Sequence, residues 1–352
     1  MIFMSFTPSE IDLIIKTRIE HGETVYNLAT GDPDYPVPPR IMGGLSYAMN
    51  MGIHNYSPVA GYQSLRQKIY PSHPTRVVIG NGAKELINLA IQATKKDTEK
   101  NEYIVCGPTW SCYTDMIRNA GGMVRYIDLS DFTKILQKIS NFVNPNTRAI
   151  VLNNPNNPTG KIYGPSTIRR LVDIAEENNF YLIVDEVYED FIYDKEKTSY
   201  MSAQMWPNTV VIKSFSKKYS LTGWRFGYAI CGNSMIASNM IHIKSNTIGP
   251  PNSLIQKAVE YNWDNIIDNR IVDYKARRDY LAESCGWKAP DAGFYFCVPV
   301  KDFDKTFKEL AEQDIYILSG ENYNMPGYAR ISFANTSLDD LKKIQPILAT
   351  IS

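Results

Sequence analysis

Short apolar runs alternate with amphipathic segments between about residues 77 and 232. The apolar runs predict strands over residues 103–106, 124–127, 148–153, 180–185, 209–213 and 225–231. Apolar residues at helical spacing predict helices over residues 83–94, 110–120 and 166–178. Strands that are apolar throughout and separated by helices indicate an α/β sheet that is covered on both faces.

The pattern changes after residue 232, where helical segments become longer. It predicts helices over residues 235–244, 253–281, 303–313 and 338–348, and strands over residues 293–300 and 329–333. This mixture is typical of a smaller α+β domain. We place the boundary at residues 247–251, so that residues 36–248 form the larger α/β domain. Residues 1–35 and 249–352 then form the smaller domain.

Length and charge agree with a globular protein and exclude several partners. The 352 residues correspond to about two domains at roughly 150 residues each. The 37 basic and 37 acidic side chains give no net charge, whereas nucleic-acid-binding proteins usually carry a basic excess. No apolar stretch approaches the roughly 18 residues that span a membrane. We therefore expect neither a nucleic-acid partner nor a membrane partner.

The cysteines and histidines predict no metal site and no disulfide framework. The five cysteines are scattered and form no Cys-x-x-Cys pair, and the four histidines are dispersed. The N-terminus shows no basic region followed by a long apolar core, so no secretory signal is predicted. These observations favour the cytoplasm, a reducing compartment.

Polar side chains follow three successive strands of the predicted sheet. The segment NNPNNPTG contains Asn157, the segment DEVY begins with Asp185, and the segment SFSKKYSLTGWR contains Lys217. Ligands of open α/β sheets bind at the carboxyl ends of the strands. An amide, a carboxylate and a lysine at one rim of the sheet therefore predict a binding site.

These segments resemble the signatures of the class I/II pyridoxal-phosphate-dependent aminotransferases, the aspartate aminotransferase-like group of fold type I. Residues 28–38 (LATGDPDYPVP), 55–66 (NYSPVAGYQSLR) and 328–332 (YARIS) are similar to further segments of that family. The resemblance runs from about residue 25 to the C-terminus. It implies a mainly parallel seven-stranded sheet flanked by helices, a smaller α+β domain, and a homodimer with shared active sites.

The resemblance assigns the central chemistry to Lys217, Asp185 and Tyr188. Lys217 would form a Schiff base with pyridoxal 5'-phosphate (PLP), since a lysine near other cationic groups shifts towards its neutral, nucleophilic form. Asp185 would keep the pyridine nitrogen protonated, which makes the cofactor an electron sink. The apolar strand before Asp185 predicts a buried carboxylate that needs such a cationic partner. Tyr188 and Asn157 would bind the phenolic oxygen of the cofactor.

The resemblance also implies a phosphate site around Arg225, which follows Lys217 by eight residues. The fork of donors on arginine suits a dianion. The hydroxyl groups of Ser214 and Ser216 would bind the same phosphate. Tyr56 would reach it from the neighbouring subunit, as in family dimers.

A second part of this phosphate site precedes the helix predicted over residues 83–94. Amide groups at a helix N-terminus bind phosphate, so Gly82, Ala83 and Lys84 are candidates for the cradle. Glu85 stands where a dinucleotide-binding fingerprint has its third glycine. That substitution counts against a Rossmann dehydrogenase.

Four residues are implied in substrate binding. Arg330 would hold the α-carboxylate through a bidentate pair, and Gly31 would let the N-terminal loop approach the substrate closely. Trp110 would stack on the cofactor ring and, together with Asn157, contact the substrate. No second arginine for a dicarboxylic substrate is identified, although Arg40 and Arg118 are candidates. Three aromatic residues favour aromatic or aliphatic side chains: Tyr35, Trp110 and Tyr295.

The main hypothesis is ping-pong transfer of an amino group between an L-amino acid and a 2-oxo acid, with Lys217 as general base. A β-lyase or a decarboxylase is an alternative, because both use the same lysine and aspartate. The segments GNGAKELI and NNPNNPTG also resemble the histidinol-phosphate aminotransferase branch. A ligand-sensing domain of a transcription regulator is disfavoured, because the resemblance begins near residue 25 and the net charge is zero. A scaffold without activity is disfavoured because the expected site residues are present.

Overall fold

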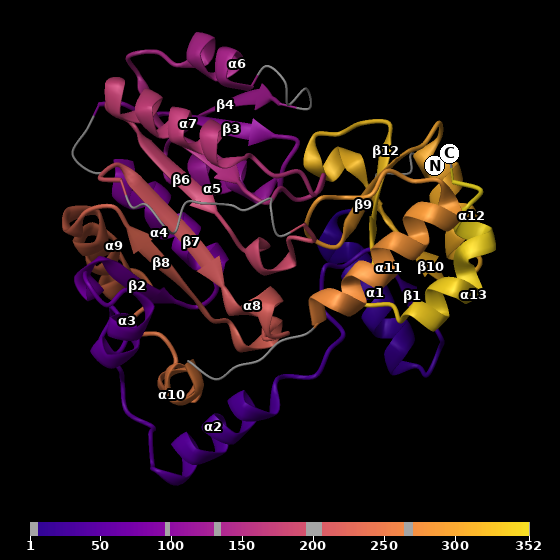
Figure 1. The fold of residues 1–352 in the computed structure, drawn as a ribbon, viewed down its shortest axis with the longest axis horizontal. Coiled ribbons are helices and arrows are strands. Elements are labelled where there is room, and N and C mark those ends of the chain that lie inside the picture. Colours follow the sequence, from indigo (N-terminus) through magenta and orange to yellow (C-terminus); the bar gives the residue numbers. More distant parts are fainter. Residues whose placement is uncertain (1–5, 96–98, 130–134, 195–205, 264–269, 352) are drawn as a thin grey trace.

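The computed structural model describes residues 6–95, 99–129, 135–194, 206–263 and 270–351. A seven-stranded sheet forms the centre of the larger unit (Figure 1). In spatial order its strands are β2 (Val77–Gly80), β8 (Gly227–Cys231), β7 (Thr209–Ser214), β6 (Tyr181–Asp185), β5 (Thr147–Asn153), β3 (Glu102–Gly107) and β4 (Met123–Asp128). Strand β8 runs antiparallel to both of its neighbours, and the other adjacent pairs are parallel. The mainly parallel sheet expected from the sequence is confirmed.

Helices cover both faces of this sheet. One face carries α4 (Ala83–Lys95), α5 (Cys112–Asn119) and α9 (Ser234–Thr247). The other face carries α6 (Ile135–Phe142) and α7 (Pro165–Glu177). Successive strand residues point to opposite faces, so Ile183 joins the first core and Leu182 the second. This explains why the central strands are apolar at every position.

Two element starts differ from the sequence prediction. Helix α5 begins at Cys112, so Trp110 lies in the loop before the helix and not within it. Strand β8 begins at Gly227, because Arg225 has a left-handed backbone with a φ of 55° that no strand contains. Both differences place a predicted site residue on a loop at the rim of the sheet.

The smaller unit lies beside the carboxyl ends of the central strands (Figure 1). Its sheet has the order β11 (Leu318–Ser319), β12 (Tyr328–Ser332), β9 (Tyr295–Pro299), and β1 (Tyr26–Asn27) pairs with β10 (Ile315–Tyr316). Its helices are α1 (Pro8–Glu20), α11 (Arg270–Cys285), α12 (Phe303–Ala311) and α13 (Leu338–Leu348). The predicted α+β character of this unit is confirmed.

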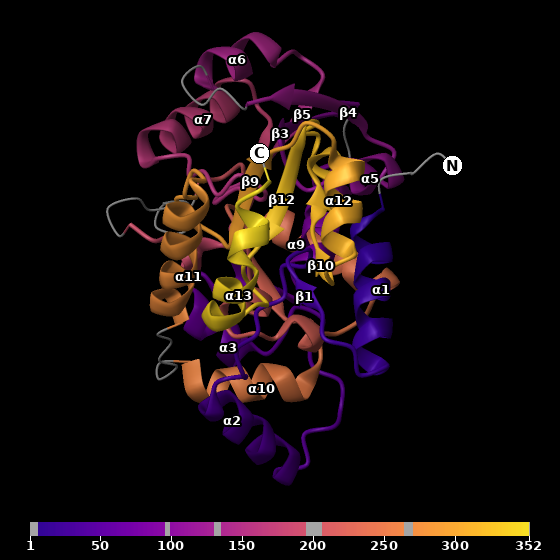
Figure 2. The ribbon, with the colours of Figure 1, turned by 90° about the vertical axis from the view of Figure 1, so that its right-hand side faces the viewer.

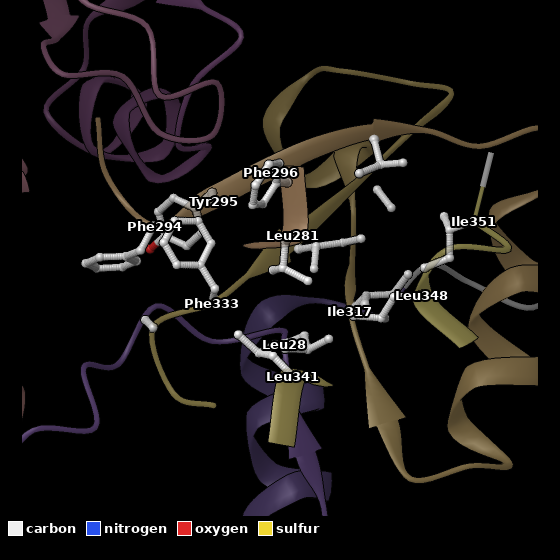
Figure 3. Close-up of a cluster of buried hydrophobic side chains, with 14 of the residues drawn as sticks. Leu28, Leu281, Phe294, Tyr295, Phe296, Ile317, Phe333, Leu341, Leu348 and Ile351 are labelled. Carbon is white, nitrogen blue, oxygen red and sulfur yellow. The ribbon is translucent and has the colours of Figure 1, made fainter. Parts of the chain in front are cut away.

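One core joins both ends of the chain in the smaller unit. Leu28, Leu281, Phe294, Phe296 and Leu341 belong to a single buried cluster (Figure 3). Full burial of each large apolar side chain contributes roughly 1.5–3 kcal/mol. The segment around Leu28 is therefore held firmly against the C-terminal strands.

The helix predicted over residues 253–281 is described as α10 (Ser253–Asn262) and α11, and residues 264–269 lie outside the described ranges. Helix α10 lies alongside α2 (Pro39–Asn50), near α3 (Gln63–Ile69), in both views (Figures 1 and 2). Ile255 of α10 shares a buried cluster with Ile41 of α2. The division at residues 248 and 249 stays a prediction, and this packing favours a boundary after α10.

None of the helices in the described ranges is long and apolar enough to cross a membrane.

Candidate active site

A cavity of about 490 Å³ lies where the two units meet, at the carboxyl ends of β5, β6 and β7. Most of the predicted site residues line it: Gly31, Ala83, Lys84, Trp110, Asn157, Asp185, Tyr188, Ser214, Ser216, Lys217, Arg225 and Arg330. Further lining residues include Asp12, Asp32, Tyr113, Asn153, Tyr295 and Tyr323. The tertiary structure therefore gathers segments from nearly the whole chain around one space.

Lys217 lies on α8 (Phe215–Lys218), the single helical turn that follows β7. The Ser214 hydroxyl caps this turn by accepting a hydrogen bond from the Ser216 amide at 3.1 Å. The Lys217 ammonium donates to the carbonyl of Gly31 at 2.7 Å. The pKa of Lys217 is lowered to about 8, chiefly by burial; Asp32 and Asp185 oppose this shift, and Arg330 and Arg225 add to it. A substantial fraction of this amine is therefore neutral near pH 7.5.

Asp185 ends β6 and is almost fully buried. Its Oδ2 accepts a hydrogen bond from the Tyr113 hydroxyl at 2.6 Å, and its Oδ1 accepts one from the Val187 amide at 3.2 Å. Burial raises the pKa of Asp185 to about 6, although both hydrogen bonds and Lys217 oppose the rise. A cation placed against this carboxylate would be bound strongly, because it would restore the ionised form.

Asn157, Tyr188, Tyr295 and Arg330 form a buried network that joins the two units. The Asn157 amide nitrogen donates to the Tyr188 hydroxyl at 3.4 Å, and this hydroxyl lies 3.0 Å from the Tyr295 hydroxyl. Arg330 donates to Asn157 Oδ1 at 3.2 Å and to the Ala29 carbonyl. The network fixes these polar groups on one wall of the cavity.

The Arg330 guanidinium retains a free donor. Its Nε is buried and has no hydrogen-bond partner within the described residues. Its central carbon lies 4.2 Å from the ring centroid of Tyr295 and 4.6 Å from that of Tyr323. An unpaired buried donor of this kind is costly. An incoming carboxylate would satisfy it.

Arg225 lines the cavity and lies against Gly82, which is not itself a lining residue. Gly82 has a φ of +85°, and a side-chain carbon added there would lie 2.7 Å from an Arg225 nitrogen. Gly82 directly precedes α4, whose first turn leaves amide groups without helical acceptors. This combination of a guanidinium, helix amides and the nearby Ser214 and Ser216 hydroxyls fits a phosphate.

Gly31 and Trp110 both line the cavity. A side-chain carbon on Gly31 would lie 1.7 Å from the Tyr295 hydroxyl, so only glycine allows this approach. The Trp110 ring makes an edge contact with Tyr113, with 5.5 Å between their centroids. The Lys84 ammonium lies 5.2 Å from the centroid of the Trp110 ring.

Four residues named in the sequence analysis lie elsewhere. Tyr56 is 93% exposed and does not line the cavity. Arg40 is exposed on α2, and Arg118 pairs with Asp115 on the surface of α5. Tyr35 packs edge-on against Tyr274, with 5.5 Å between their centroids. Neither arginine lies in the cavity of its own subunit.

The sequence analysis missed Tyr113 and the side chain of Lys84. Tyr113 was not named among the candidate residues, and in the structure its ring belongs to the core beneath one face of the sheet. Its polar end nevertheless reaches the carboxyl end of β6, where the rim chemistry lies. Lys84 was considered only for its backbone amide. The position of Lys84, the second residue of a helix that starts at the rim of the sheet, could have identified its side chain as a candidate.

Comparison with known proteins gives the family. The model of the family "Aminotransferase class I and II" matches residues 23–345. The chain belongs to this family. This aminotransferase is 32% identical to the aspartate aminotransferase of Thermotoga maritima, over 94% of this chain and 92% of that protein. It is 28% identical to the aspartate/prephenate aminotransferase of Thermus thermophilus, over 92% of this chain and 89% of that protein.

The fold of this aminotransferase agrees with its family. The crystal structure of the Thermotoga maritima aspartate aminotransferase matches it with a TM-score of 0.89 at 30% identity, covering 98% of this chain and 96% of that one. The predicted fold class and the predicted transfer of an amino group between an amino acid and a 2-oxo acid are confirmed. These similarities favour amino-group transfer over the lyase, decarboxylase and histidinol-phosphate alternatives.

Proposed function

We propose that this aminotransferase uses PLP, bound in the cavity between its two units. The observation that carries this proposal is the meeting of Lys217, Asp185 and Arg225 around one space. The amine of low pKa, the buried carboxylate and the guanidinium beside helix amides match an aldehyde, a pyridine nitrogen and a phosphate, respectively. When bound, PLP supplies an aldehyde that takes up the amino group and a ring that accepts electrons.

Lys217 and Asp185 divide the proton chemistry. Lys217 acts as the base that removes the α-proton of the substrate, and a pKa of about 8 suits a base that works near neutral pH. Asp185 holds a proton on the ring nitrogen, and Tyr113 orients the carboxylate through its hydroxyl. Tyr188 and Asn157 lie on the adjoining wall, where they would bind the phenolic oxygen of the cofactor.

Arg330 and Asn157 hold the substrate. The free Nε of Arg330 offers a donor to the α-carboxylate, and the bidentate geometry of arginine fixes its orientation. The burial of Arg330 excludes water, which strengthens this ion pair. The α-carbon of the substrate is thereby presented to Lys217.

The substrate class that we propose is a dicarboxylic amino acid such as aspartate. The names of the relatives support aspartate. Four cationic side chains line the cavity within the described ranges, and Lys217, Arg225 and Arg330 already have roles. The Lys84 ammonium is therefore the group that would bind the side-chain carboxylate of the substrate. This proposal replaces the preference for aromatic or aliphatic side chains.

We also propose a homodimer in which Tyr56 reaches the phosphate site of its partner. The side chain of Tyr56 is exposed, as expected of a residue that completes a neighbouring site. Large apolar side chains are exposed on α2, on the turn that follows α2 and on α10: Met42, Tyr47, Met49, Met51 and Tyr261. Their concentration suits a protein interface. A cytoplasmic location stays a prediction.

The test is a titration of the purified, PLP-loaded protein with single amino acids in the absence of an oxo acid. We expect aspartate to abolish the visible absorption of the bound cofactor and to release one equivalent of 2-oxo acid. Retained absorption with accumulating ammonia or carbon dioxide would instead support the lyase or decarboxylase alternative. A protein that takes up no PLP would contradict the proposal.

A Lys84→Met variant tests the substrate class. It should lower kcat/KM for aspartate by about 10- to 100-fold, because the second carboxylate loses its cation. The kcat/KM for alanine serves as the control and should change little. An equal loss for both amino acids would contradict recognition of the second carboxylate by Lys84.

A further inference from the structure

A buried ion pair lies directly behind the candidate phosphate site. Lys244 of α9 is fully buried, and its ammonium lies 2.5 Å from Glu85 Oε1. The same ammonium donates to the carbonyl of Ile79 at 3.0 Å. Lys244 therefore contacts both the end of β2 and the first turn of α4. The proposed chemistry does not use either charged group.

The second oxygen of Glu85 holds the turn between these two elements. Glu85 Oε2 accepts hydrogen bonds from the amide of Asn81 at 2.9 Å and from its side chain at 2.6 Å. Glu85 is the third residue of α4, from which a carboxylate commonly reaches back to the residue before the helix. Here it binds Asn81, one residue earlier than Gly82. The Gly82 amide, which such a carboxylate would otherwise bind, thus stays available for a ligand.

The charge of Glu85 needs compensation at this position. A carboxylate beside a phosphate site repels the dianion, and burial strengthens that repulsion. Lys244 places a cation on the far side of Glu85 from Asn81. Removal of the cation would leave the carboxylate uncompensated or draw it towards the helix amides.

We propose that Lys244 is a positioning residue for the cofactor phosphate. Through Glu85 and Asn81 it holds the turn before α4 in the shape that receives the phosphate, and it neutralises the carboxylate behind that site. This inference rests on the proposed use of PLP.

The test compares two ligands that differ only in the phosphate. Cofactor-free wild-type protein and a Lys244→Met variant are titrated with PLP and with pyridoxal, and both dissociation constants are measured by visible absorption. We expect the variant to bind PLP about 10- to 100-fold more weakly, as is typical for one partner lost from a buried ion pair. Its affinity for pyridoxal should change by less than about threefold.

Two further variants separate positioning from general destabilisation. The double variant Lys244→Met/Glu85→Gln should recover most of the affinity for PLP, because a glutamine oxygen still accepts from Asn81 and no charge remains. Arg125→Met removes the ion pair with Glu102, 3.1 Å away on the distant edge of the sheet. It should leave the ratio of the two dissociation constants unchanged.

If Lys244→Met does not fold, Lys244→Gln tests the neutralising charge alone, because its amide still donates to Glu85. PLP should again bind more weakly to this variant, and pyridoxal should not. Equal weakening of PLP and pyridoxal, or no weakening of either, would overturn the role of Lys244. Failure of the wild-type protein to bind PLP would instead refute the proposed cofactor.

Discussion

Burial acts in opposite directions on the two ionisable groups at the centre of the site. It lowers the pKa of the Lys217 amine to about 8 and raises the pKa of the Asp185 carboxyl to about 6. Both shifts have the same cause, since a charged group loses hydration when it is buried. The lysine thereby becomes a nucleophile, and the aspartate becomes a site for a cation.

The pKa of Lys217 determines how fast the cofactor-free protein takes up PLP. With a pKa of about 8, roughly a quarter of the amine is neutral at pH 7.5, against about one part in a thousand for an ordinary lysine. We expect the uptake rate to rise with pH and to level off above about pH 8.5. Stopped-flow absorption measures this rate, and Lys217→Ala should show no such phase. A rate that rises steadily to pH 10 would contradict the shift.

Asp185 makes the stability of the cofactor-free protein depend on pH. Its pKa is about 6 in the folded protein and 3.8 ordinarily, so the folded state binds more protons between these values. Its contribution to the free energy of unfolding therefore falls as pH rises from about 4 to 6. The stability difference, Asp185→Asn minus wild type, should rise by about 2 kcal/mol over this range. Urea unfolding measures this difference.

A second variant tests whether Asp185 causes this fall in stability with pH. Tyr113→Phe removes the hydrogen bond that lowers the pKa of Asp185. The upper limit of the pH range over which stability falls should therefore rise, while the lower limit, set by the unfolded state, stays near pH 4. A stability difference that does not vary with pH in Asp185→Asn would show that the carboxyl is not shifted.

At the scale of elements, the turn between β2 and α4 shapes the phosphate site. Gly82 allows a left-handed backbone there and leaves room for the Arg225 guanidinium. Arg225 itself has a left-handed φ, which directs its side chain out of line with β8. Gly82 and Arg225, two residues of positive φ from distant segments, thus lie against each other beside the cavity.

Gly82→Ala should disturb this meeting. The added carbon would lie 2.7 Å from an Arg225 nitrogen, and alanine is strained at a φ of +85°. We expect the dissociation constant for PLP to rise at least about tenfold. Gly164→Ala is the matched control, because its φ is −66° and no atom lies within 4 Å of the added carbon. Equal binding by both variants would contradict the steric argument.

At the scale of the molecule, the site exists only where the two units pack together. Arg330 and Tyr295 come from the smaller unit, whereas Asn157 and Tyr188 come from the larger one. The carbonyl of Gly31, in the N-terminal segment of the smaller unit, accepts a hydrogen bond from Lys217 of the larger unit. Any movement of one unit against the other would change all of these contacts together.

The proposed dimer predicts complementation between inactive variants. A hybrid of one Lys217→Ala subunit and one Tyr56→Ala subunit has one site with both residues intact. Mixing and refolding the two variants should therefore restore up to about a quarter of the wild-type activity at equal proportions, since half of the dimers are hybrids with one intact site. Ultracentrifugation of the same samples should show a dimer.

The control for complementation pairs Lys217→Ala with Asp185→Ala. Both residues belong to the same subunit's site, so each site in the hybrid lacks one of them. No activity should return. Recovery in this control, or none with Tyr56→Ala, would contradict sharing of the site between subunits.

Local sequence was sufficient to predict the rim residues Asn157, Asp185 and Lys217. Each follows a strand that is recognisable from its apolar run, and parallel strands of one sheet end at the same edge. The same logic predicted the α/β core and the smaller α+β unit. These features depend on the period of the side chains along the chain, which the sequence displays directly.

Only the tertiary structure decided which distant side chains complete the site. Tyr113 lies 72 residues before Asp185, and Arg330 lies 173 residues after Asn157, so no local spacing reveals their contacts. The absence of Arg40 from the cavity of its own subunit likewise depends on its position on α2. The pKa shifts depend on burial, which is a property of the packed molecule. The sequence alone determined which chemical groups are available, and packing determined which of them meet, because contact and hydration are set in three dimensions.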